Sequence, residues 1–254
     1  LDTGNAGYLD FSKAAMPALP GLAEVAARAA SEFPAYLGGS GFDPMGLPEL
    51  REAIANRYAA RGLPTDPEQI MVTIGAQHAI ALLARTLLAR GDSALVESPS
   101  YPHAYDALRA TGARLVPVSV TSEDGWDEPA LAQAIQRTSP ALGYLMPDFH
   151  NPTGRTMTEE LRSRVVALAA RQGTVLVADE TMAELSIDRS ESHPPFGAGA
   201  GAGAPGVVLI GSVGKTVWGG VRVGWIRAER SIIHKLVRAR SAGDLGTPVL
   251  EQLV

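Results

Sequence analysis

Short apolar runs rich in β-branched residues alternate along this chain with longer segments of helical periodicity. The apolar runs cover residues 70–73, 93–97, 114–118, 142–146, 174–178 and 207–211. Runs of this length that alternate with helices predict strands of a mainly parallel sheet covered by helices. The pattern therefore predicts an α/β fold.

Segment 48–61 illustrates the helical pieces. It opens with a proline, which suits the first turn of a helix; apolar residues then recur at Leu50, Ile54 and Tyr58, and Gly62 follows. The same features predict two further helices, over residues 76–90 and 158–172.

Two regions lack this periodicity. Residues 1–47 contain many glycines and prolines and predict an arm packed over the core or over a partner. The Gly/Ala-rich tract 197–206 predicts a mobile surface loop. We expect one large domain over residues 1–254, interrupted at its end, because the final apolar stretch 247–254 has no helix-stop signal.

Composition narrows the class of protein. Apolar residues make up 46% and charged residues 19%, which suits a globular core, and the net charge of -5 provides no basic surface for nucleic acid. There is no cysteine, and no apolar run approaches the ~18 residues of a membrane span. We therefore expect a cytoplasmic protein without a membrane partner or a thiolate metal site. His78, His103 and His150 lack the spacing of metal ligands, so no metal site is predicted.

Lys215 is the first candidate for chemistry. It is one of only three lysines, and it follows the apolar run 207–211 directly. The carboxyl ends of strands are where α/β sheets bind ligands. A lysine beside apolar walls loses proton affinity, and its neutral amine can attack an aldehyde. The alternative is an ordinary solvated loop lysine.

The sequence Gly214-Lys215-Thr216 also resembles part of a phosphate-binding P-loop. A P-loop requires a glycine four residues before the Gly-Lys pair, and Leu209 stands at that position. The acidic strand that ends in Asp179 also precedes the lysine, whereas in P-loop proteins it follows. A P-loop is therefore disfavoured.

Three further polar residues are candidates: Asp179 and Asn151 follow other predicted strands, and Arg222 lies seven residues after Lys215. Asp179 could keep a pyridine nitrogen protonated, Asn151 could donate its amide to a phenolate oxygen, and Arg222 could bind a phosphate with two parallel hydrogen bonds. Each also has a simpler interpretation: a helix cap for Asp179, a turn for Asn151 and a surface position for Arg222. Glu180 and Glu184 could support such a site, although exposed helical acids are more common.

Together these residues resemble the fold-type I, class I/II aminotransferases, which bind pyridoxal phosphate. The resemblance covers essentially the whole chain and rests on motifs in the family order, namely Ser98-Pro99-Ser100-Tyr101-Pro102, Asn151-Pro152-Thr153-Gly154, Asp179-Glu180, Ser212-Val213-Gly214-Lys215 and Arg222. It implies a mostly parallel seven-stranded sheet in an α/β/α sandwich.

The resemblance also implies residue roles. Lys215 would form the Schiff base with pyridoxal 5'-phosphate, Asp179 would pair with the ring nitrogen, and Asn151 would bind the ring oxygen. Tyr101 would stack on the ring. The phosphate would be held by Ser212, Arg222 and the backbone of Gly75, Ala76 and Gln77, which open a predicted helix with free N–H groups.

Within the family, the segments 41–51 and 75–79 look like the effector domain of MocR-type regulators, in which a GntR-type winged helix precedes an aminotransferase-like domain. Two functions therefore stay open: amino-group transfer from an amino acid, or sensing of a small amino compound without turnover. DNA would be contacted only by a winged helix outside this chain.

Two positions depart from the family pattern, and one region is missing. Thr181 or Met182 stands where a tyrosine is common, and Phe42 stands where many relatives place a tyrosine that reaches the partner subunit. The resemblance implies a homodimer. It also implies a C-terminal small domain, carrying the arginine for the substrate carboxylate, that this chain lacks.

Overall fold

The computed structural model describes residues 14–187, 193–200 and 206–254, and its centre is one sheet of eight strands in the order β1-β8-β7-β6-β5-β2-β3-β4. The strands are β1 Ile70–Thr73, β2 Ser93–Ser98, β3 Arg114–Thr121, β4 Gly125–Trp126, β5 Leu142–Leu145, β6 Val175–Asp179, β7 Val207–Ser212 and β8 Gly224–Arg227. All six strands predicted from the apolar runs are confirmed, with β3 extending three residues beyond its predicted end.

The sheet is mainly parallel. Strands β2, β3, β5, β6 and β7 pair in parallel, whereas β8 lies antiparallel between β1 and β7. The two-residue strand β4 adds a short antiparallel pair at the β3 edge. It extends the expected seven strands to eight. Neither β4 nor β8 was among the predicted strands, because β4 has two residues and β8, which begins with Gly224 and ends with Arg227, contains no apolar run longer than two residues.

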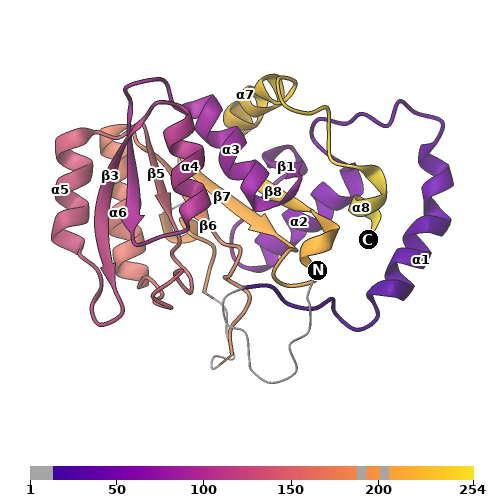
Figure 1. Ribbon diagram of the computed structural model, residues 1–254, viewed down its shortest axis with the longest axis horizontal. Helices are drawn as coiled ribbons and strands as arrows, with labels where there is room; N and C mark the ends of the chain where they lie inside the picture. The colour runs from indigo at the N-terminus through magenta and orange to yellow at the C-terminus, as the bar shows by residue number, and fades with distance from the viewer. Residues whose placement is uncertain (1–13, 188–192, 201–205) are drawn as a thin grey trace, which may run out of the picture.

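Helices cover both faces of the sheet, as expected for an α/β/α sandwich (Figure 1). The helices are α1 Leu22–Glu32, α2 Pro48–Ala60, α3 Gly75–Leu87, α4 Pro102–Ala110, α5 Glu128–Thr138, α6 Glu159–Gln172, α7 Arg230–Arg240 and α8 Val249–Leu253. Short 3₁₀ helices span Phe33–Tyr36, Pro67–Gln69, Ala198–Ala200 and Gly219–Val221.

Two separate apolar cores hold the layers together. Helices α3, α4 and α7 pack on one face, where Tyr144 and Val177 are buried, and we call this the α3 face. Helices α2, α5 and α6 pack on the other face, where Leu209 and Phe196 are buried, and we call this the α2 face. Because successive residues of a strand point to opposite faces, each strand contributes to both cores.

The helix ends follow local rules. Helix α2 begins at Pro48, and α6 begins after Thr158, whose side chain accepts a hydrogen bond from the Leu161 N–H at 3.3 Å. Gly173 ends α6 in the left-handed conformation, with φ at 70°. The predicted helices 48–61, 76–90 and 158–172 are confirmed within a few residues.

The N-terminal segment contains a helix that its sequence did not predict. Helix α1 lies at the end of the molecule opposite α5, near α8 (Figure 1). Ala29 is the buried residue of this helix, and its other alanines are exposed. The described part of the arm does pack on the core, because the Leu19 N–H donates to the Val217 carbonyl at 3.1 Å.

The structure bears on two further expectations. No helix within the described residues is long and apolar enough to cross a bilayer. Of the Gly/Ala-rich tract, residues 201–205 lie outside the described part of the chain.

Candidate functional site

The candidate residues gather at one edge of the sheet, the edge formed by the carboxyl ends of its parallel strands. Gly75, Tyr101, Asn151, Asp179 and Lys215 lie at or just after the carboxyl ends of five different strands, all running in the same direction. Strand β8 runs the opposite way, so its beginning comes to this edge. The register aligns Thr73 of β1 with Gly224 of β8, and Gly224 with Ser212 of β7, which places Arg222 beside the same row. The edge is where α/β sheets hold ligands.

The first turn of α3 forms a backbone cradle. Gly75 opens the helix with φ at 78°, and its carbonyl accepts a hydrogen bond from Thr73 Oγ1 at 3.0 Å. Gly224 lets β8 pass close to this turn, because a Cβ there would lie 2.7 Å from the Gly75 carbonyl carbon and 2.9 Å from the Ala76 nitrogen. The free N–H groups at the start of a 13-residue helix favour an anion.

Arg222 stands beside this cradle. Its guanidinium donates to the carbonyls of Ile74 and Gly219, each at 3.2 Å, and a Cβ on Gly75 would lie 2.7 Å from its Nη2. The residue has φ at 56°, in the left-handed region that few non-glycine residues adopt. Arg222 is exposed, so its remaining N–H groups are accessible for a phosphate.

The loop after β7 carries Ser212 and Lys215. Ser212 Oγ donates to the Val223 carbonyl at 3.1 Å and accepts from the Gly214 N–H at 3.0 Å. Lys215 is half-buried, and its Nζ donates to the carbonyl of Ala14 in the N-terminal arm. The arm therefore lies directly over the amine. Leu209, the residue that disfavours a P-loop, is buried inside β7.

Asp179 is buried at the end of β6 with only 4% of its surface exposed. Tyr144 donates its hydroxyl proton to Asp179 Oδ2 at 2.6 Å, and the Thr181 N–H donates to Oδ1 at 3.0 Å. Burial and the Asp179 charge raise the pKa of Tyr101, whereas Arg222 lowers it, so the three side chains share one electrostatic environment. Gln77 Nε2 donates to the carbonyl of His103 at 3.2 Å. This bond joins the α3 cradle to the first turn of α4, the helix that follows Tyr101.

A buried network supports the Asn151 loop. Glu97 accepts hydrogen bonds from Trp126 Nε1 at 2.7 Å and from the Met146 N–H at 2.9 Å, and it lies 3.3 Å from His150 Nε2. His150 Nδ1 lies 2.9 Å from Thr153 Oγ1. This agrees with the expected hydrogen-bonding role of His150. Asn151 follows the buried His150 directly and is itself exposed.

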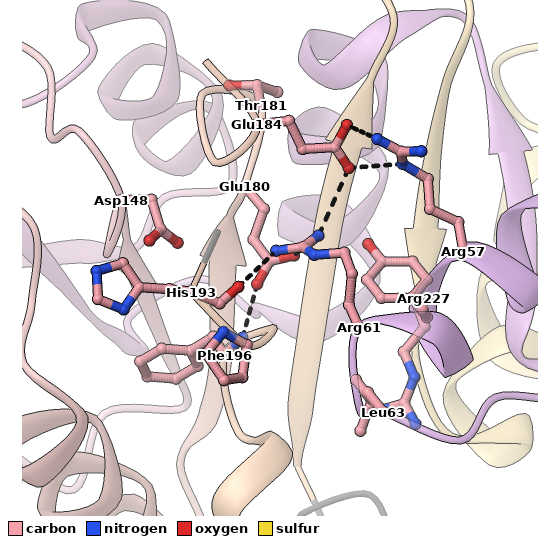
Figure 2. Close-up of polar contacts among 12 residues, drawn as sticks. Arg57, Arg61, Leu63, Asp148, Glu180, Thr181, Glu184, His193, Phe196 and Arg227 are labelled. Atoms are coloured by element: carbon pink, nitrogen blue, oxygen red, sulfur yellow. Dashed lines mark hydrogen bonds and ion pairs between the residues drawn. The ribbon is translucent and has the colours of Figure 1, made fainter. Parts of the chain in front are cut away.

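Glu180 is not an exposed helical acid, which corrects the simpler expectation. Figure 2 shows it beneath Arg61, in a cluster that also contains Arg57 and Glu184. Glu180 Oε1 accepts from the Phe196 N–H at 2.6 Å, and Oε2 lies 3.7 Å from Arg61 Nη1. Burial raises the pKa of Glu180 to about 7, although Arg61 acts in the opposite direction.

Arg61 joins three segments in this cluster. It lies 3.7 Å from Glu184 and donates to the His193 carbonyl at 3.2 Å, while Glu184 also pairs with Arg57 (Figure 2). A cavity of about 20 Å³ borders Arg61, Glu180 and Ser212. Sequence reasoning missed this role of Arg61, because its partners come from distant segments and leave no local motif.

A larger cavity of about 690 Å³ lies away from these polar residues. It is bordered mainly by apolar parts of the arm, α1 and α8, and it touches the candidate site only through the segment 218–221. None of the candidate site residues named above borders this cavity.

Comparison with known proteins identifies the family. The sequence profile of the family described as "Aminotransferase class I and II" matches residues 10–251. The chain belongs to the class I and II aminotransferases. Its membership implies pyridoxal phosphate as the cofactor and confirms the resemblance found in the sequence.

Relatives of this aminotransferase chain include both enzymes and regulators. It is 34% identical to the 2-aminoadipate transaminase of Thermus thermophilus over 197 residues, which are 78% of this chain and 49% of that protein. It is 32% identical over 210 residues to the Escherichia coli "Uncharacterized HTH-type transcriptional regulator YdcR", covering 83% of this chain and 44% of that protein. The chain thus spans about half the length of these relatives.

Solved structures agree with this assignment. The α-aminoadipate aminotransferase LysN from Thermus thermophilus, complexed with N-(5'-phosphopyridoxyl)-L-leucine, superposes with a TM-score of 0.79. It is 32% identical, and the match covers 93% of this chain and 60% of that one. An archaeal alanine:glyoxylate aminotransferase matches with a TM-score of 0.77 at 29% identity, covering 92% of this chain and 58% of that one.

The described residues fit pyridoxal phosphate. The α3 cradle and Arg222 suit a phosphate. A Cβ on Gly75 would displace the Arg222 guanidinium, and a Cβ on Gly224 would collide with the backbone of Gly75 and Ala76. The buried Asp179 suits a protonated ring nitrogen, and Lys215 provides an amine for the aldehyde.

Proposed function

We propose that this chain forms the cofactor-binding unit of an aminotransferase, in which Lys215 binds pyridoxal phosphate covalently and then carries a proton of the substrate amino acid. The observation that carries the proposal is the convergence of Lys215, Asp179, Arg222 and the α3 cradle at one sheet edge. Pyridoxal phosphate supplies an aldehyde and an electron-accepting ring there.

Each residue of the site has its own role. Lys215 Nζ would hold the cofactor through its aldehyde and, with the substrate amino acid in that place, would move the α-proton as a general base. Asp179 holds a proton on the ring nitrogen through its carboxylate. Arg222 and the N–H groups of residues 75–77 bind the phosphate, together with Ser212, while Asn151 bonds the ring oxygen and Tyr101 stacks on the ring.

The test is to trap the covalent link. Mixing the protein with pyridoxal phosphate and reducing with borohydride should label Lys215, which peptide mapping can distinguish from Lys13 and Lys235. Lys215→Arg should lose both the label and the visible absorption band, whereas Lys235→Arg should keep them. A label on Lys13 or Lys235 in the unaltered protein would refute the assignment.

A sensing function is the second candidate, because regulators such as YdcR match this chain over as large a share as the transaminase does. In that case the same covalent link reports an amino compound to a DNA-binding domain. A panel of amino acids should convert the bound cofactor to its amine form in an enzyme. A full-length protein that converts none, but whose DNA binding changes with one of them, would be a sensor.

A homodimer is part of the proposal. Phe42 is 67% exposed near the start of α2, which agrees with an arm that reaches another copy. Sedimentation of the full-length protein should give a closed dimer or a larger symmetric assembly. A strict monomer with undiminished cofactor affinity would contradict it. A cytoplasmic location stays a prediction.

A further inference from the structure

The Tyr144–Asp179 hydrogen bond belongs to neither the phosphate cradle nor the lysine loop. Tyr144 is 1% exposed and Asp179 is 4% exposed, and their oxygens are 2.6 Å apart. A buried carboxylate without donors is costly, so each donor that reaches it affects its charge state and orientation.

The strand register explains why the two side chains meet. Tyr144 of β5 lies opposite Val177 of the parallel neighbour β6, and both are buried on the α3 face. Asp179 lies two residues beyond Val177, so its side chain points to the same face and sits diagonally from Tyr144. The hydrogen bond follows from the order of strands, not from a local motif.

The direction of this hydrogen bond is fixed by charge. Burial, followed by the Asp179 carboxylate, raises the pKa of Tyr144 well above its usual value. The phenol therefore keeps its proton at neutral pH, and Tyr144 is the donor. Asp179 is the acceptor.

The two donors to Asp179 occupy different oxygens. Tyr144 reaches Oδ2, and the Thr181 N–H reaches Oδ1 at 3.0 Å. A planar carboxylate held at both oxygens has a fixed orientation and still has lone pairs for one more partner. The backbone donor cannot be removed by changing a side chain, but the tyrosine donor can.

We propose that Tyr144 is a positioning residue that acts through Asp179, holding its carboxylate oriented toward the ring nitrogen of the cofactor. The proposal rests on the proposed function, in which Asp179 faces that nitrogen. Without the phenol, Oδ2 loses its donor and only the Thr181 N–H at Oδ1 still orients the carboxylate, so its pairing with the ring nitrogen is weakened.

The experiment compares pyridoxal phosphate with its 1-deaza analogue, which has carbon in place of the ring nitrogen. Tyr144→Phe removes the hydroxyl and keeps the ring, and thermal denaturation confirms that the variant folds. In titrations of the apo-protein at pH 7, the variant should bind pyridoxal phosphate at least roughly tenfold more weakly than the unaltered protein does. Its affinity for the analogue should be unchanged.

Two controls make the result specific. Tyr58→Phe also removes a buried hydroxyl, which accepts from Trp225 Nε1 at 3.0 Å on the α2 face, and it should leave the ratio of the two affinities unchanged. In an Asp179→Asn background, adding Tyr144→Phe should cause no further loss for pyridoxal phosphate.

Three results would overturn the role of Tyr144: equal losses for both cofactors, no loss for pyridoxal phosphate, or the same loss in the Asp179→Asn background. Failure of the proposed function looks different. In that case the unaltered protein would bind both cofactors equally and would carry no label on Lys215.

Discussion

Asp179 and Glu180 are adjacent in sequence, yet their carboxylates lie on opposite faces of the sheet. Asp179 meets Tyr144 on the α3 face, whereas Glu180 meets Phe196 and Arg61 on the α2 face. Asp179 thus faces the candidate cofactor site, whereas Glu180 holds the segment 193–197 against the α2 face. Substitution of Asp179 should therefore affect cofactor binding, whereas substitution of Glu180 should affect stability.

Glu180→Gln should change the pH dependence of stability. The pKa of Glu180 is raised to about 7 in the folded chain, so its favourable contribution is complete below about pH 4.5 and is lost as the pH rises through 7. Glutamine has no such loss. The free energy of unfolding of the variant, relative to the unaltered protein, should therefore rise by on the order of 3 kcal/mol from pH 4.5 to 8.

Urea denaturation at several pH values measures this change. Glu184→Gln is the matched control, because Glu184 belongs to the same cluster but its side chain is 26% exposed. Its relative stability should show no comparable rise. A flat curve for Glu180→Gln would mean that Glu180 is already charged near pH 5 in the folded protein.

Arg162→Leu should be among the most destabilising substitutions. Arg162 Nη2 lies 2.6 Å from Asp148 Oδ1, and both residues are buried. Its loss leaves a buried carboxylate without its cation, at a cost of about 3–5 kcal/mol in unfolding free energy. Arg164→Leu, which breaks the exposed pair with Glu128, should cost less than about 1 kcal/mol. Adding Asp148→Asn to Arg162→Leu should recover part of the loss, and equal costs for the two arginines would contradict this prediction.

Arg222→Ala should weaken binding of pyridoxal phosphate by about 2 kcal/mol or more, because a phosphate loses a charged bidentate donor. Binding of pyridoxal, which lacks the phosphate, should change little. Arg222→Lys should restore only part of the affinity, since an ammonium cannot form two parallel hydrogen bonds. Fluorescence titration of both ligands gives the comparison, and equal losses for the two would exclude a phosphate contact.

Gly224→Ala should disturb the α3 cradle. A Cβ there would come within 2.9 Å of backbone atoms of Gly75, Ala76 and Gly211, none of which can move independently. We expect a loss of about 1–3 kcal/mol in stability and weaker phosphate binding. Gly38→Ala is the control, because nothing lies within 4 Å of a Cβ at that position. Undiminished cofactor affinity in Gly224→Ala would show that the cradle tolerates a shift.

The sequence by itself determined the layers and the order of the chemistry. Apolar runs such as 207–211 are long enough to mark strands, and polar residues directly after them must reach the sheet edge. The family motifs add Lys215, Asp179 and Arg222 as candidate cofactor residues, and the family profile confirms the family to which those motifs belong. Helix α1 was not recognised because the segment 1–47 around it contains many glycines and prolines, and strand β8 was not recognised because Gly224 and Arg227 leave only two apolar residues in it.

Only the tertiary structure decided which residues support the site. Tyr144 and Asp179 are 35 positions apart, and they meet because β5 and β6 are neighbours in one particular register. Arg61 and Glu180 likewise meet although they follow α2 and β6, which are far apart in the sequence. Local periodicity reports which side of an element is buried, but the partner across the interface depends on strand order and packing, which are properties of the whole chain.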